Sequence, residues 1–361
     1  MQIGEPLAQL PWVRRLHDVD DARSHGVAAP RMRAMRDAGQ RLGDSFRSEP
    51  TIDALVTIDL STLVYPTTFA FNRAVSLPFP YLALSHRTLL MRVNAGGEKK
   101  LILFNPTDYQ ASEATPFFAQ LLAKMPSKDL ARRILAKQTG QVDSHLRALG
   151  VQPEEIDVIA FDHFHTQDLR PLIGGRTARG ESVSARFPNA VVLAPEAEWN
   201  DWDDLHPMQK AWFVQDGKLG VPMDRVVLTN NDLLLGDGCM LLRTPGHTSG
   251  NQTLFVHGER GVFGVSENGC CADNWAPHES SIPGLRRSAQ QYGVDVILNS
   301  NTPELAAEQY NSMMLERAIV DRSEENPAFF QMFSSSEVSA SAFAPGIKPT
   351  LRFGERNSGT L

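Results

Sequence analysis

Apolar and β-branched residues gather in three early segments of the chain, a composition typical of β-strands. Between the last two segments, residues 94–97 have the sequence Asn-Ala-Gly-Gly, which indicates a hairpin turn. We therefore expect an early antiparallel sheet, with strands at 52–65, 81–93 and 100–104. The next stretch is rich in Leu, Ala, Lys and Arg and predicts helices at 111–125 and 128–149, with Gly150 as the stop signal.

Beyond Gly150, short apolar runs alternate with segments of helical composition. Strands are expected at 156–161, 190–194, 226–229, 240–243, 254–257, 262–265 and 294–298, and helices at 196–215, 285–292 and 303–320. This order of elements predicts an α/β protein with two mixed β-sheets packed face to face and helices on both outer sides. Trp199, Trp202 and Trp212 fall at helical spacing, which favours packing in a core or interface over a substrate platform.

Composition divides the chain into three parts. Residues 1–50 are rich in Arg, Ala, Asp and Gln and predict an N-terminal helical arm. Residues 51–320 carry most of the expected strands and helices. Residues 321–361, with serines at 334–336, predict a loop-rich C-terminal extension. The arm and the extension are the candidates for mediating a homodimer.

Length and charge narrow the functional class. The chain has 361 residues, enough for one large domain or two small ones, and its net charge of −7 argues against nucleic acid as a partner. Its three cysteines cannot pair fully, which fits a reducing compartment. The start lacks a basic segment followed by an apolar core, and polar residues and Pro66 interrupt the longest apolar region, near 55–70. We therefore expect a cytoplasmic enzyme that acts on a small molecule and does not enter a membrane.

Two histidines that follow the predicted strand at 156–161 are the most informative feature of the sequence. His163 and His165, at i and i+2 past a strand end, can aim both imidazoles at one point, and imidazole is the commonest protein ligand of a metal. Asp168, in the same turn, either adds an oxygen ligand or caps the following helix. Asp162 either braces a histidine from behind or merely ends the strand. Because an isolated His-x-His pair is more often incidental, the metal hypothesis needs a third ligand.

A third histidine lies in a tight turn further along the chain. Pro245 and Gly246 force a turn after the predicted strand at 240–243, which would hold His247 at the strand's end. With His163 and His165, it would give a metal three protein ligands and leave a position open for water. That arrangement is typical of a catalytic rather than a structural metal site.

These segments resemble the metallo-β-lactamase superfamily. The sequence at 163–168, His-Phe-His-Thr-Gln-Asp, is similar to that family's His-x-His-x-Asp-His signature, and 244–250 is similar to its second histidine turn. Further segments that resemble the family in the expected order are 149–157, 263–267 and 298–301. The resemblance implies an αββα sandwich, with 51–320 as the metallo-β-lactamase-like domain, and hydrolysis by a metal-bound hydroxide.

The sequence departs from the family at its second metal site. Gln167 stands where the family has Asp, Asp168 where it has His, Glu267 where it has a bridging Asp, and Asn301 where it has the last His. Glu267 and Asp168 can still bind metal, and either is a candidate general base. Gln167 and Asn301 are neutral and weak ligands for zinc, and they are candidates for contact with substrate or with a second ion. An oxygen-rich second site would suit Mn²⁺ or Fe²⁺ better than a histidine-rich site would.

Three hypotheses follow from these residues. The first is a hydrolase with one strongly held ion, zinc by default, on His163, His165 and His247, with Glu267 as a fourth ligand. The second is a two-metal hydrolase with an altered second site. The third is a metal-binding protein without turnover, a sensor or an assembly subunit. Family analogy points to an ester or lactone as substrate, while amide, thioester, phosphoester and carbon–halogen bonds stay open.

Overall fold

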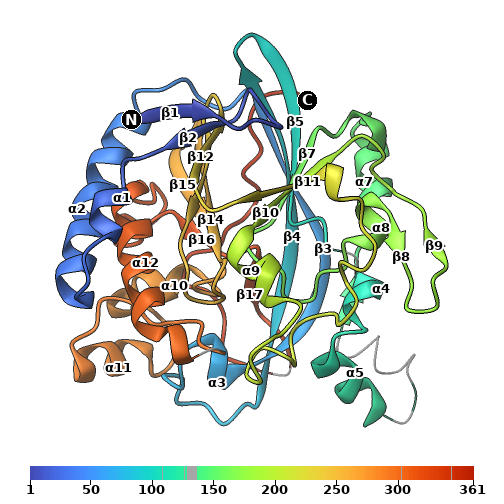
Figure 1. Ribbon diagram of the computed structural model, residues 1–361. Helices are drawn as coiled ribbons and strands as arrows, with labels where there is room; N and C mark the ends of the chain where they lie inside the picture. The colour runs from blue at the N-terminus through green and yellow to red at the C-terminus, as the bar shows by residue number, and fades with distance from the viewer. Residues whose placement is uncertain (108, 126, 128–135, 302, 343) are drawn as a thin grey trace.

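Two β-sheets packed face to face form the centre of the protein (Figure 1). The computed structural model describes residues 1–361 except 108, 126, 128–135, 302 and 343. Within these residues, seven strands form the first sheet and eight form the second, and a separate two-stranded hairpin lies outside both. Both large sheets are mixed, since β15 and β16 pair in parallel in the first and β5, β7, β10 and β11 do so in the second.

The strand order places segments from both ends of the chain in the two sheets. The first sheet has the order β1 (Ile3–Pro6), β2 (Arg14–Leu16), β12 (Asp232–Gly236), β13 (Cys239–Arg243), β14 (Gln252–Gly258), β15 (Gly261–Val265) and β16 (Met332–Phe333). The second has the order β11 (Val226–Thr229), β10 (Val191–Pro195), β7 (Val158–Ala160), β5 (Glu98–Phe104), β4 (Tyr81–Ala95), β3 (Ala54–Pro66) and β6 (Ala136–Gln138), with β17 (Ser336–Ser339) also paired to β4. The hairpin consists of β8 (Gly175–Arg176) and β9 (Ser182–Val183).

Alternation along each strand explains the layers. On β13, Leu241 lies in the core between the two sheets, whereas Met240 and Leu242 lie on the outer face of the first sheet. On β4, Leu89 and Met91 point into the same inter-sheet core. Successive side chains of a strand point to opposite faces, so each sheet has two apolar faces and needs helices outside.

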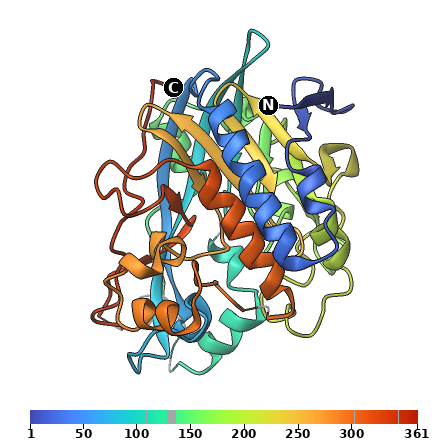
Figure 2. The ribbon, with the colours of Figure 1, turned by 90° about the vertical axis from the view of Figure 1, so that its left-hand side faces the viewer.

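Two long helices, α2 (Ala28–Phe46) and α12 (Ala306–Ile319), cover the outer face of the first sheet and lie side by side (Figure 2). Their close contact depends on glycine. A Cβ on Gly43 would lie 2.5 Å from the carbonyl oxygen of Ile319, and one on Gly39 would lie 2.9 Å from that of Leu315. A larger residue at either position would push the helices apart.

Shorter helices cover the outer face of the second sheet (Figure 1). Leu146 of α7 (Val142–Ala148) and Leu172 of α8 (Arg170–Ile173) pack in the same apolar cluster as Leu103 and Ile159 of the sheet. The architecture is therefore the expected αββα sandwich. The remaining α-helices are α1 (Asp20–Arg23), α3 (Thr67–Ala70), α4 (Tyr109–Ser112), α5 (Pro116–Ala123), α9 (Glu196–Asp201), α10 (Ala272–Trp275) and α11 (Leu285–Tyr292).

Three expected elements differ from the structure. Part of the helix expected at 128–149 lies outside the described residues, and the remainder is strand β6 followed by α7, because residues 136–138 pair with β3. The helix expected at 196–215 ends after Asp201, and turns that include Pro207, which has no N–H to donate, replace the rest. Residues 294–298 pair with no strand in the described part of the chain.

The two ends of the chain belong to the layers. Residues 1–50 contribute β1, β2 and α2, and residues 321–361 contribute β16 to one sheet and β17 to the other. Among the described residues, no helix combines the length and the apolar character needed to cross a membrane.

Candidate active site

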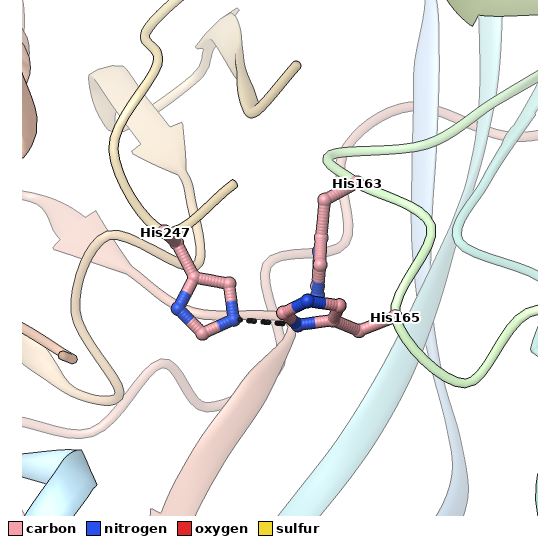
Figure 3. A group of neighbouring side chains, drawn as sticks. All are labelled: His163, His165 and His247. Carbon is pink, nitrogen blue, oxygen red and sulfur yellow. Dashed lines mark hydrogen bonds between the residues drawn. The ribbon is translucent and has the colours of Figure 1, made fainter. Parts of the chain in front are cut away.

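Three buried histidines meet at one edge of the sandwich (Figure 3). His163 and His165 follow β7, and His247 lies in the turn between β13 and β14. One ligand atom from each histidine lies within 4.8 Å of those from the other two, and this is the only such His, Cys, Asp or Glu group among the described residues. The expected three-histidine cluster is therefore present.

Local backbone geometry holds the two histidine loops. Thr166, directly after His165, has a φ of +63°, a left-handed conformation that is uncommon outside glycine, and its N–H donates to the carbonyl of Trp212 at 2.7 Å. Gly246, directly before His247, packs against α12 so closely that a Cβ there would lie 2.4 Å from the Cα of Gln309. The turn that presents His247 therefore requires glycine.

Oxygen acceptors fix the orientation of each imidazole. The contacts are His163 Nδ1 to Asp162 Oδ1 at 2.7 Å, His165 Nε2 to Gln209 Oε1 at 2.7 Å and His247 Nδ1 to the Asn299 carbonyl at 3.2 Å. On the other side of the rings, His165 Nδ1 lies 3.1 Å from His247 Nε2. An acceptor on one ring nitrogen leaves the opposite nitrogen to bind metal, as is usual for histidine ligands. Asp162 therefore orients His163, which is one of the two roles expected for it.

The charges around the histidines favour a cation. Asp162, Glu198 and Glu267 are all buried nearby, and no Lys or Arg ion pair to any of them is seen in the described part of the chain. Burial lowers the pKa of His163, but the charge and hydrogen bond of Asp162 outweigh it and raise that pKa to about 9. The carboxylates therefore stabilise positive charge here, whether it is a proton or a metal ion.

The other two histidines favour the neutral form that binds metal. Burial lowers the pKa of His165 well below its ordinary value, and the neighbouring His163 and His247 lower it further. Burial, together with His163, also lowers the pKa of His247 to about 3. The donor set, three buried and oriented imidazoles among carboxylates, therefore fits a divalent metal ion.

Glu198 connects the two histidine loops and was not predicted from the sequence. Its Oε1 accepts the N–H of Phe164, between the first two histidines, at 2.7 Å, and its Oε2 accepts the hydroxyl of Thr248, next to His247, at 3.0 Å. A signal for it exists, because β10 is parallel to β7 and Glu198 follows the end of β10 as the histidines follow the end of β7.

Asp168 does not join the histidines, which corrects its expected role as a metal ligand or base. Its Oδ1 accepts from the backbone N–H of Arg170 at 3.1 Å and from Nε at 2.9 Å, and its Oδ2 accepts from Nη2 at 2.7 Å. Asp168 lies one residue before Leu169, the N-cap of α8, and is held by a two-pronged ion pair with Arg170.

Glu267 lies in the pocket that contains the histidines but outside the three-histidine group. Its Oε1 accepts hydrogen bonds from the hydroxyls of Ser334 and Ser335, each at 2.7 Å, and from the N–H of Ser336 at 2.8 Å. Burial raises the pKa of Glu267, and the charge of Asp162 raises it further. The serines of the expected loop-rich extension thus become part of the site.

Gln167 and Asn301, the two uncharged residues considered as contacts for substrate or a second ion, differ in position. Gln167 lines the pocket and donates from Nε2 to the Thr107 hydroxyl at 2.7 Å. Asn301 is buried but is not among the described residues that line the pocket. Asn299, two residues earlier, lines it instead, and its side chain donates to the Glu267 carbonyl at 3.0 Å. The expected contact of Asn301 with substrate or a second ion stays a prediction.

The pocket encloses about 1010 Å³ of empty space, a volume that includes its open mouth. One part of its surface is polar and contains the three histidines. Another part is apolar and includes Trp212, whose ring centre lies 6.1 Å from that of His165. The tryptophan expected only as packing is therefore also part of the pocket wall.

Some solved structures resemble this chain at low sequence identity. No protein-family model and no curated protein matches the sequence. Similar solved structures include a quorum-quenching N-acyl homoserine lactone lactonase (17% identity, 68% of this chain and 87% of that chain, TM-score 0.44). Another is a probable metal-dependent hydrolase from Staphylococcus aureus (12% identity, 65% of this chain and 79% of that chain, TM-score 0.46). A third is a hydrolase of the β-lactamase superfamily (16% identity, 68% of this chain and 85% of that chain, TM-score 0.40).

Proposed function

We propose that this protein is a metal-dependent hydrolase that holds one divalent ion, zinc by default, on His163, His165 and His247. The observation that supports it is the set of three buried imidazoles, each oriented by an acceptor and surrounded by carboxylates without a Lys or Arg partner in the described residues. Such an arrangement is costly to bury unless a cation occupies it.

A bound metal ion supplies Lewis acidity and lowers the pKa of a water that it coordinates. The protein supplies the proton acceptor. Glu267 lines the pocket, and its raised pKa makes its carboxylate a better base near neutral pH. Because three donors engage Oε1, we place the transferred proton on Oε2. The ester or lactone bond remains our leading proposal for the substrate.

The alternative proposal is a metal-binding protein without turnover. Both proposals require the metal, and only the hydrolase requires Glu267 to exchange a proton. The other inferences from the sequence, a cytoplasmic location and a homodimer, stay predictions.

Metal analysis combined with substrate screening tests the proposal. We expect about one equivalent of metal in the purified protein, loss of that metal in His247→Ala, and no loss in His25→Ala, which changes an exposed histidine outside the site. Esters and lactones should be hydrolysed, with the rate constant falling in Glu267→Gln while the metal stays bound. A protein that takes up no metal on reconstitution contradicts both proposals, and full metal loading without hydrolysis contradicts the first.

A further inference from the structure

Helix α5 turns three of its apolar side chains toward the pocket, whereas Phe117 packs against the protein core. None of its residues is buried, yet Phe118, Leu121 and Leu122 are half-buried and line the pocket. A short surface helix normally places its apolar residues against the core of the protein. Apolar side chains that instead line a cavity are a surface for an apolar ligand.

Aromatic contacts connect this helix to the histidines. Phe117 of α5 stacks on Trp212 with a centroid distance of 4.6 Å and an interplanar angle of 29°, and its N–H donates to the carbonyl of Ala211 at 2.9 Å. Trp212 in turn lies beside His165. The apolar wall is therefore held in place and is continuous with the three-histidine site.

Strands β3 and β4 extend the same apolar wall of the pocket. Leu63 and Val64 of β3 and Leu84 of β4 also line the pocket. The acidic side chains that line it in the described residues are Glu113, Asp162 and Glu267, no Lys or Arg is found there, and His163, paired with Asp162, supplies positive charge only among the histidines. A ligand with its own negative charge away from the histidines would meet like charge and no counter-ion.

We propose that the pocket selects uncharged substrates that carry an apolar acyl or aryl group of several carbons, which packs along α5 while the carbonyl lies at the histidines. This inference rests on the proposed hydrolase function and specifies its substrate class. Phe118, Leu121 and Leu122 are then the residues that determine chain-length specificity.

Equilibrium binding of small amides tests the inference separately from hydrolysis. Hexanamide and acetamide are titrated into the full chain, with and without zinc, and followed by tryptophan fluorescence and calorimetry. Hexanamide has four more methylenes than acetamide, and full burial of each gives about a threefold to fourfold gain in affinity, so hexanamide should bind up to roughly 100-fold tighter.

Variants of α5 identify the surface. Leu121→Ala and Leu122→Ala should each weaken hexanamide several-fold and leave acetamide unchanged, whereas Gln120→Ala, an exposed position on the same helix, should change neither. Thermal unfolding checks that each variant is folded. Equal affinity for the two amides, or equal effects of Gln120→Ala and Leu122→Ala, overturns the inference. Chain-length selectivity in a protein that hydrolyses nothing would contradict the proposed function alone.

Discussion

Replacing Glu198 with glutamine tests two opposing effects of its carboxylate, which are to support metal binding and to destabilise the metal-free fold at high pH. Glu198 is buried on α9 and accepts hydrogen bonds from both histidine loops, through Phe164 and Thr248. Glutamine keeps the shape but removes the charge, and its single carbonyl oxygen can satisfy only one of the two donors. We expect the variant to bind metal more weakly and yet to be more stable than the parent at high pH when no metal is bound.

The magnitudes follow from the environment of the carboxylate. Loss of a group that supports metal ligands costs about 10- to 100-fold in metal affinity. Burial raises the pKa of Glu198 from its ordinary 4.5 to about 7. As pH rises from 4.5 to 7, the unfolded chain loses this proton and the folded chain retains it. The folded state is therefore destabilised by about 3 kcal/mol above pH 7, and by nothing below 4.5.

Glutamine removes that penalty and loses one hydrogen bond worth about 1 kcal/mol. Without metal, Glu198→Gln should therefore gain about 2 kcal/mol of stability at pH 8 and lose the advantage near pH 4.5. Competition with a chromophoric chelator measures the metal affinity, and chemical denaturation in chelator at both pH values measures stability. Glu196→Gln, at an exposed position on the same helix, is the control. Unchanged metal affinity, or a metal-free variant that is less stable at pH 8, would refute the reasoning.

Three further substitutions test other parts of the site. Gly246→Ala places a Cβ 2.4 Å from the Cα of Gln309, so the His247 turn should shift, and metal titration should show affinity reduced at least tenfold. Asp168→Asn weakens the ion pair with Arg170 and should lower the melting temperature without changing the metal stoichiometry; a lost equivalent of metal would restore Asp168 as a ligand. Glu316→Ala removes the carboxylate that accepts from four buried donors and should lower the free energy of unfolding by about 3–5 kcal/mol, as measured by chemical denaturation. A nearly unchanged free energy of unfolding would mean that water replaces the carboxylate. Those donors are Thr253, Ser266, Asn268 and Trp275.

The sequence predicts the fold where local pattern and tertiary environment agree. The strand expected at 240–243 is confirmed as β13, because alternate residues there face two different apolar layers. Residues 136–138, Ala-Lys-Gln, have helical composition but form β6, because the neighbouring edge of β3 offers backbone hydrogen bonds. β12 (Asp232–Gly236) was not expected, although Leu233 lies in the inter-sheet core.

The residues of the site could likewise be predicted only where local geometry fixes their positions. His163, His165 and His247 could be predicted because strand ends and a Pro-Gly turn fix their positions through local geometry. The direction of the Asp168 side chain could not, because Arg170, two residues later, competes for both of its oxygens. The acceptors behind His165 and His247, unlike Asp162 behind His163, come from elements distant in sequence and could not be predicted from local pattern. These acceptors include Gln209 and the carbonyl of Asn299.

The distribution of carboxylates favours one metal ion over two. Arg170 forms an ion pair with Asp168, which lies outside the three-histidine group, while Asp162 is committed to the Nδ1 of His163. Glu267 is then the remaining pocket carboxylate near the histidines in the described residues, and three donors from the C-terminal extension hold its Oε1. A second ion would have one anionic ligand and neutral amides such as Gln167, too few to offset its loss of hydration. These contacts support the proposal of a single dication on the three histidines with Glu267 as the base.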